Sequence, residues 1–101
     1  MNLINTSLLF ITLISPSHTA NSSIIDFCTS ISDLAESTAS ARDNGMTKNQ
    51  SKQIIKEAFT DNTEYLPMIN ALIDVVYKHP SIDPYDMRII SYKACINTET
   101  K

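Results

Sequence analysis

Apolar and small residues recur at steps of three and four along most of this chain, which is the spacing of one face of an α-helix. The pattern predicts four amphipathic helices separated by short connections. These expected helices cover residues 22–43, 48–60, 64–78 and 84–96. We therefore predict an all-α fold, a small four-helix bundle in which neighbouring helices run antiparallel.

Capping and turn residues mark the boundaries of these helices. Gly45 is the only glycine of the chain and stands where the end of a helix favours a left-handed residue. Thr47 and Gln50 have the spacing of a capping box, which predicts that the second helix begins just after Thr47. Asp83 followed by Pro84 predicts the start of the last helix, with Asp83 as its N-cap.

The predicted third helix is apolar around most of its circumference. Asn70, Asp74 and Lys78 form a narrow polar stripe at steps of four, and we expect Asp74 and Lys78 to pair. At the end of this helix, before Pro80, the imidazole of His79 is expected to bond the free backbone carbonyls. Such a helix is either enclosed by the other three or lies partly at a surface for a partner, and the pattern leaves both open.

An uncharged apolar segment opens the chain. Its continuous apolar stretch, residues 8–14, is too short to span a membrane, because a membrane-spanning helix needs roughly 20 apolar residues. Pro16 and several small residues follow, as in a secretory signal peptide. We predict a signal peptide over residues 1–20 and a single helical domain over 21–101, with no stable membrane anchor. The alternative is a buried N-terminal strand or helix of a cytosolic protein.

The two cysteines, Cys28 and Cys95, are expected to form a disulfide in an oxidising compartment, so we predict a periplasmic or secreted protein. The bond would close a loop of about 66 residues and stabilise the domain by roughly 4 kcal/mol. A domain of this size buries only a limited part of its surface, so its hydrophobic core alone gives marginal stability. Two independent buried thiols are the alternative.

Charge and composition exclude several classes of function. The net charge of -3 is mildly acidic and evenly scattered, so we expect no binding to nucleic acid or to anionic membranes. Beyond the predicted signal peptide His79 is the only histidine, and no arrangement of a nucleophile with a base can be built. We predict no enzymatic activity, no catalytic residue, no metal site and no cofactor.

Tyrosines provide the candidate binding residues. Tyr65, Tyr77 and Tyr85 flank the ends of the third and fourth helices, and tyrosine is enriched at interfaces. Together with Asp74 they are our candidates for contact with a protein partner or a second copy of the chain. The alternative function is a carrier of a small molecule or lipid, with an apolar cavity between the helices. Three methionines would line that cavity: Met46, Met68 and Met87.

The C-terminal third of the chain carries a resemblance. The sequence Val-Val-Tyr-Lys-His-Pro at residues 75–80, followed by a helix that ends near Cys95, resembles short exported bacterial helical proteins. One such group is the periplasmic immunity proteins that neutralise the peptidoglycan amidase toxins of type VI secretion. The resemblance implies an exported immunity protein or inhibitor. The N-terminal third departs from it, because it lacks a further cysteine and a glycine-rich first segment, and no functional residue carries over.

Overall fold

The computed structural model describes residues 2–61 and 63–99, with side chains from residue 23 onward. The chain is all-α, as predicted, and no strand occurs in this part of it. Four α-helices and one short 3-10 helix follow one another along the sequence. Their bounds are α1 (Asn2–Asp43), α2 (Lys48–Ala58), η1 (Thr63–Tyr65), α3 (Leu66–Lys78) and α4 (Pro84–Glu99).

The predicted helices are all present, with differences at their ends. α1 begins at Asn2 and thus includes the segment predicted as a signal peptide. The side chains of residues 1–22 lie outside the described residues, so the signal peptide and the domain boundary at residue 21 stay predictions. α4 extends to Glu99, beyond the expected end at residue 96, and the Thr98 hydroxyl donates to the Ala94 carbonyl in its last turn.

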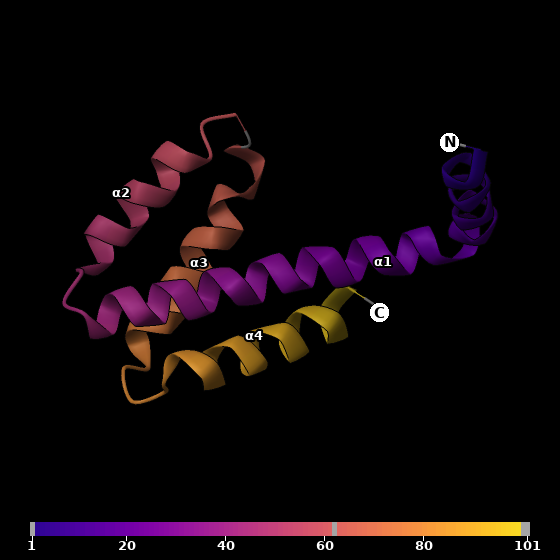
Figure 1. Cartoon of the computed structure of the whole chain (residues 1–101). Helices are drawn as coiled ribbons and strands as arrows, with labels where there is room; N and C mark the ends of the chain where they lie inside the picture. Colours follow the sequence, from indigo (N-terminus) through magenta and orange to yellow (C-terminus); the bar gives the residue numbers. More distant parts are fainter. Residues whose placement is uncertain (1, 62, 100–101) are drawn as a thin grey trace.

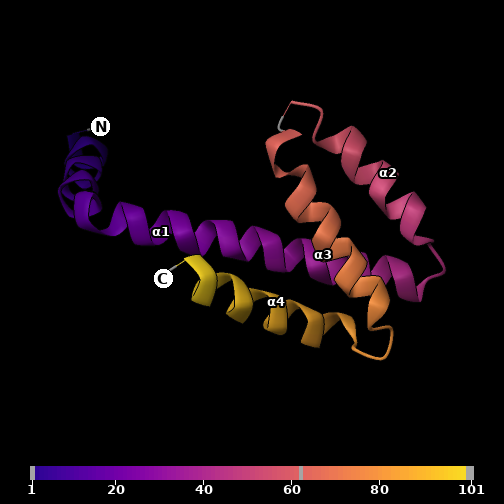
Figure 2. The same cartoon turned by 180° about the vertical axis from the view of Figure 1, so that it is seen from behind.

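α1 and α4 lie side by side and run antiparallel (Figures 1 and 2). The face of α1 that packs inward is made of small residues at steps of four, three and four. These residues are at most 1% exposed: Cys28, Ser32, Ala35 and Ala39. Small side chains let two helix backbones approach closely, because the interaxial distance depends on the residues at the contact. The Ser32 hydroxyl is satisfied within α1, since it donates to the Thr29 carbonyl at 2.8 Å.

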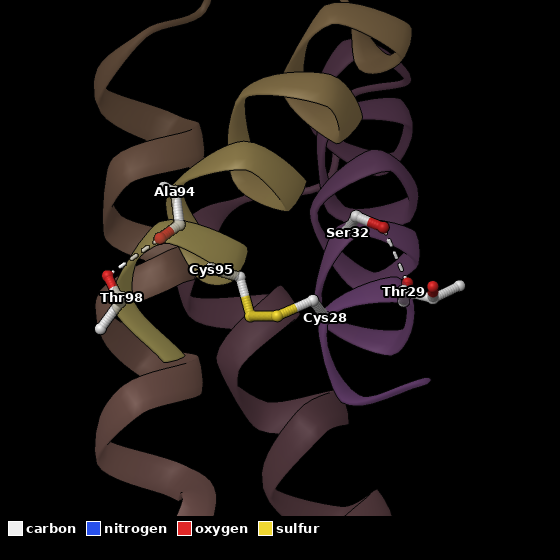
Figure 3. Close-up of a disulfide and its surroundings, with 6 residues drawn as sticks. All are labelled: Cys28, Thr29, Ser32, Ala94, Cys95 and Thr98. Atoms are coloured by element: carbon white, nitrogen blue, oxygen red, sulfur yellow. Dashed lines mark hydrogen bonds between the residues drawn. A yellow bond between two sulfur atoms is a disulfide. The ribbon is translucent and has the colours of Figure 1, made fainter. Parts of the chain in front are cut away.

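A disulfide joins Cys28 of α1 to Cys95 of α4, as predicted (Figure 3). The two Cα atoms are 5.5 Å apart, which is the usual separation for this bond. The bond fixes the middle of α1 to the last turns of α4. A disulfide of this kind is typical of an oxidising, non-cytosolic compartment.

α2 and α3 form an antiparallel hairpin that crosses the α1–α4 pair (Figures 1 and 2). α3 provides three of the seven buried hydrophobic residues of the described core, because Ile69, Ile73 and Val76 point inward and are at most 2% exposed. Val76 packs in a cluster with Ala35 and Ala39 of α1 and with Met87 of α4. The core is therefore built on α1, which α3 and α4 contact from different sides.

The predicted caps are present. Gly45 has a φ of 97°, so it occupies the left-handed region that glycine favours. The Thr47 hydroxyl accepts from the Gln50 amide at 3.1 Å, and the Gln50 side chain accepts from the Thr47 amide at 2.8 Å, which completes the capping box. At the start of α4 the Asp83 carboxylate accepts from the Asp86 amide at 2.9 Å.

Arg42 takes the role that we predicted for the imidazole of His79. Its guanidinium donates to the carbonyls of Val76 at 2.8 Å, His79 at 3.1 Å and Ile82 at 2.7 Å. A planar fork with five N–H donors suits several acceptors at once, whereas the exposed imidazole reaches none of these carbonyls. The Arg42 side chain, only 7% exposed, therefore joins the end of α1 to the end of α3.

Candidate functional site

Tyr77 is used inside the fold. Its hydroxyl donates to the Met46 carbonyl at 2.7 Å and lies 2.8 Å from the Ser51 hydroxyl. Because the single Tyr77 proton goes to Met46, Ser51 is the donor in the second bond. The ring is half-buried against the core cluster. These contacts tie α3 to α2 and to the α1–α2 connection, so the polar tip of this candidate binding residue is already occupied.

Asp74 pairs with α2, and the expected pair with Lys78 does not form. The Asp74 carboxylate lies 2.7 Å from the Lys52 ammonium and 3.5 Å from that of Lys48. The hydrogen bond with Lys52 is the main cause that lowers the pKa of Asp74 below its usual value. Of the polar stripe of α3, Asp74 therefore joins α3 to α2. The pairs are half-exposed, so their contribution to stability is small.

The Asp74 pairs make a small part of the stability depend on pH. Because the pKa of Asp74 is lowered in the folded state, this stabilisation is full above the usual aspartate pKa and disappears as the pH falls through the lowered value. We expect Asp74→Asn to be slightly less stable than the wild type at pH 7 and equal to it in strong acid. Urea unfolding at several pH values measures the difference. A difference that persists unchanged to acid pH would contradict the assignment.

The other two candidate tyrosines, Tyr65 and Tyr85, lie far apart in the fold. Tyr65 directly precedes α3, and its ring centroid is 6.2 Å from that of Phe27 on α1. Tyr85, which is 64% exposed, stands in the first turn of α4, beyond the opposite end of α3. A helix of 13 residues spans about 20 Å, so the structure does not gather the candidate residues into one patch. Their role in binding stays a prediction.

An apolar groove runs between α1, α3 and α4, and sequence reasoning did not locate it. We call it the α3–α4 groove; its volume is about 380 Å³. α1 provides Phe27 and Ile31, and α3 and α4 form the walls. The wall residues are Met68, Ala71, Leu72, Val75, Met87, Ile90, Ser91, Ala94, Cys95, Thr98 and Glu99. The disulfide is therefore part of the wall.

The groove exists because α3 and α4 both pack against α1 but barely contact each other. Large apolar side chains on its two walls consequently stay open to solvent. Val75 is 46% exposed on α3, and Ile90 is 48% exposed on α4. The sequence left open whether α3 is fully enclosed by the other helices. The structure shows that one side of α3 is buried and that the other side faces this groove.

A second apolar groove adjoins the first on the other side of Met68. It has a volume of about 520 Å³ and shares Phe27, Ile31 and Met68 with the α3–α4 groove. Its further lining includes Leu34, Phe59, Tyr65 and Ile69. Tyr65 is thus the one predicted binding residue that borders this apolar surface. Met68 and Met87 line the α3–α4 groove as the carrier hypothesis expects, whereas Met46 lies elsewhere, beside the α1–α2 turn.

Charged residues close to the grooves are mainly acidic. Asp33 lines the second groove. The Arg88 guanidinium of α4 forms ion pairs with Asp33 and with Glu36, and the distance to Glu36 is 3.1 Å. The hydrogen bond with Asp33 is the main cause that raises the pKa of Arg88. Glu99 lines the α3–α4 groove near the end of α4. No lysine or arginine is among the described residues that line either groove.

The described part of the chain lacks two particular structural features. It contains no group of three or more histidine, cysteine, aspartate or glutamate side chains placed to hold a metal ion. None of its helices combines the length and the apolar character needed to cross a bilayer.

Comparison with protein-family models, with curated proteins and with solved structures finds no match to this chain.

Proposed function

We propose that this chain is a small exported, non-enzymatic interaction protein that binds a partner protein through the α3–α4 groove. The observation that carries the proposal is the groove itself, with Val75 and Ile90 nearly half exposed on its facing walls. Apolar surface of this kind, between helices and bounded by polar residues, is typical of a binding site. The disulfide supports a periplasmic or secreted location.

An immunity protein or inhibitor is the specific form of this function that the sequence favours. The resemblance of residues 75–95 to periplasmic immunity proteins supports it, and this segment contains Val75, Ile90 and Cys95 of the groove walls. The partner would then be a secreted toxin or hydrolase. Of the tyrosines predicted to bind, Tyr65 borders the apolar surface, and Tyr85 lies exposed apart from the groove.

Ile90→Asp is expected to abolish capture of a partner. An aspartate on the groove wall would place a charge against the apolar face of the partner and lose most of the affinity, roughly a hundredfold or more. Capture from the native compartment under non-reducing conditions, with mass spectrometry of the bound proteins, provides the measurement. Since Ile90 is 48% exposed, the variant should remain folded.

Ile54→Asp is the matched control. Ile54 is 50% exposed on α2, does not line either apolar groove, and undergoes the same chemical change. A partner that the wild type and Ile54→Asp retain and Ile90→Asp loses supports the proposal. A partner retained equally by all three proteins would show that the groove is not the binding surface.

A carrier of a small apolar molecule or lipid is the second candidate. Met68 and Met87 favour it, because both flexible thioethers line the α3–α4 groove. Native mass spectrometry of freshly purified protein distinguishes the two functions. A stoichiometric apolar ligand that Ile90→Asp fails to retain would favour the carrier, whereas an empty groove together with partner capture favours the interaction protein.

A further inference from the structure

The two sulfurs of the disulfide differ in their exposure. Cys28 is fully buried, on the face of α1 that packs against α4. Cys95 is partly exposed and lines the wall of the α3–α4 groove, whereas Cys28 lines neither apolar groove. The two side chains meet from α1 and α4 in Figure 3. The disulfide is therefore closed on the side of Cys28 and open to the groove on the side of Cys95.

The side chains that cover Cys95 along α4 are short or exposed. In a helix each side chain leans over the turn that precedes it, so the residues three and four positions after Cys95 cover it. These residues are Thr98 and Glu99, which are exposed and line the groove. The Thr98 hydroxyl donates to the Ala94 carbonyl at 2.9 Å, on its own helix (Figure 3). A small molecule in the groove can therefore approach Cys95.

Access decides how a disulfide reacts with a thiol. The reaction begins when a thiolate attacks one of the two sulfurs, and its rate depends on which sulfur the thiolate can reach. A buried cysteine is close to inert, because no nucleophile contacts its sulfur. In the folded chain burial protects Cys28 from attack, and Cys95 is the sulfur that a thiolate can reach.

We propose that the α3–α4 groove directs small thiols to Cys95, which is therefore the site at which the disulfide exchanges. The thiolate forms a new bond to the Cys95 sulfur, and the bond between Cys95 and Cys28 breaks. The electron pair of the broken bond stays on the Cys28 sulfur, which takes up a proton from water. The small thiol is oxidised to a mixed disulfide and Cys28 is reduced, so the step needs no further oxidant.

Exchange at Cys95 changes the groove covalently. The attached thiol lies on the groove wall, and the last turns of α4 lose their bond to α1. Exchange at Cys28 would instead require the attached group to enter the packed contact between α1 and α4. The reaction needs no partner protein, so the site of exchange is independent of the proposed function.

The adduct on the wild-type chain identifies the sulfur that is attacked. The oxidised protein is treated with 2-mercaptoethanol in native buffer, and excess N-ethylmaleimide stops the reaction at early times. Peptide mass mapping then locates the two labels. We expect mercaptoethanol on Cys95 with maleimide on Cys28, about tenfold or more in excess of the reverse arrangement. In urea the excess should fall below about twofold, because unfolding exposes both sulfurs alike.

Single-cysteine variants measure the two rates separately. Cys28→Ala keeps the Cys95 thiol, and Cys95→Ala keeps the Cys28 thiol. The uncharged disulfide 4,4′-dithiodipyridine reports the reaction of each thiol by absorbance. In native buffer the Cys95 thiol should react about tenfold or more faster, and urea should remove the difference. Circular dichroism shows whether each variant is folded; where one is not, the labels on the wild-type chain decide.

Two substitutions on α4 test the route through the groove. Thr98→Phe places a ring over Cys95 and should slow formation of the adduct on the otherwise wild-type chain by about threefold or more. Asn97→Phe is the matched control, since Asn97 is exposed on the same turn and lines neither groove. It should change the rate by less than about twofold.

Four results would overturn the proposal. The first is mercaptoethanol on Cys28 as often as on Cys95 in native buffer. The second is a preference for Cys95 that persists unchanged in urea, which would assign it to the local sequence and not to the fold. The third is equal slowing by Thr98→Phe and Asn97→Phe. The last is a native disulfide that reacts at neither sulfur and exchanges in urea alone.

Discussion

Replacing both cysteines, as Cys28→Ala with Cys95→Ala, is expected to lower the free energy of unfolding by about 4 kcal/mol. The two residues are 67 positions apart, so the bond removes a large share of the conformational freedom of the unfolded chain. A domain of this size has a total stability of only about 5 to 10 kcal/mol. The variant should therefore lose roughly 40 to 80% of its stability. Urea unfolding followed by far-UV circular dichroism measures the loss.

Reduction provides the control for the cysteine variant. A reducing agent should destabilise the wild type to a similar degree and leave the double variant unchanged. Binding of a partner at the α3–α4 groove should weaken in parallel, since Cys95 and the adjoining turn of α4 form part of the groove wall. A loss of less than about 1 kcal/mol in the double variant would show that packing between α1 and α4 suffices without the bond.

Arg42→Ala is expected to lower the free energy of unfolding by about 3 kcal/mol. The substitution leaves the carbonyls of Val76 and Ile82 without their donor, and it leaves the His79 carbonyl with only the Ile82 amide, at a site where the guanidinium is only 7% exposed. Arg42→Lys should recover part of the loss, because an ammonium supplies donors without the planar fork. A melting temperature lowered by roughly 10 °C or more is the expected result for a domain of this size.

His79→Ala is the informative control for Arg42. The imidazole is exposed and bonds none of the carbonyls at the end of α3, so its removal should change stability by no more than about 0.5 kcal/mol. If His79→Ala lowered the free energy of unfolding strongly and Arg42→Ala left it unchanged, the imidazole would be the capping group. That result would contradict the contacts of Arg42.

Local features of the sequence were enough to predict the helices. The capping box at Thr47, the left-handed Gly45 and the cap at Asp83 each act over three or four residues, so the sequence contains both partners of every contact. The disulfide was predictable for a different reason, since a chain with two cysteines leaves a single possible intramolecular pairing.

Contacts between helices were not predictable in this way. Arg42 reaches carbonyls 34 to 40 residues away, and Asp74 pairs with lysines of α2 rather than with Lys78 on its own helix. Periodicity shows which face of a helix is apolar but does not show which helix covers it. The apolar circumference of α3 indicated that the other helices could leave part of its apolar surface exposed. The position of the groove, however, depends on the separation of α3 from α4 over α1.

The predicted binding residues show the same limit. Tyr77 was a reasonable candidate by residue type, but its hydroxyl is bonded to Met46 and Ser51 within the fold. The candidate binding residues do not include Val75 and Ile90, which the structure places on facing walls of the groove. Whether an apolar residue belongs to the core or to a binding surface depends on tertiary packing, which the periodic pattern does not contain.

The oxidation state of the protein in its native compartment tests the central claim most directly. We propose that the domain is exported, and its first and last described helices are joined by the Cys28–Cys95 disulfide. The measurement is intact mass after alkylation under denaturing, non-reducing conditions. We expect a chain that lacks the predicted signal peptide and carries no alkyl group, with two groups added after reduction. Two alkylated thiols before reduction, on a chain that retains residues 1–20, would contradict both the export and the bond.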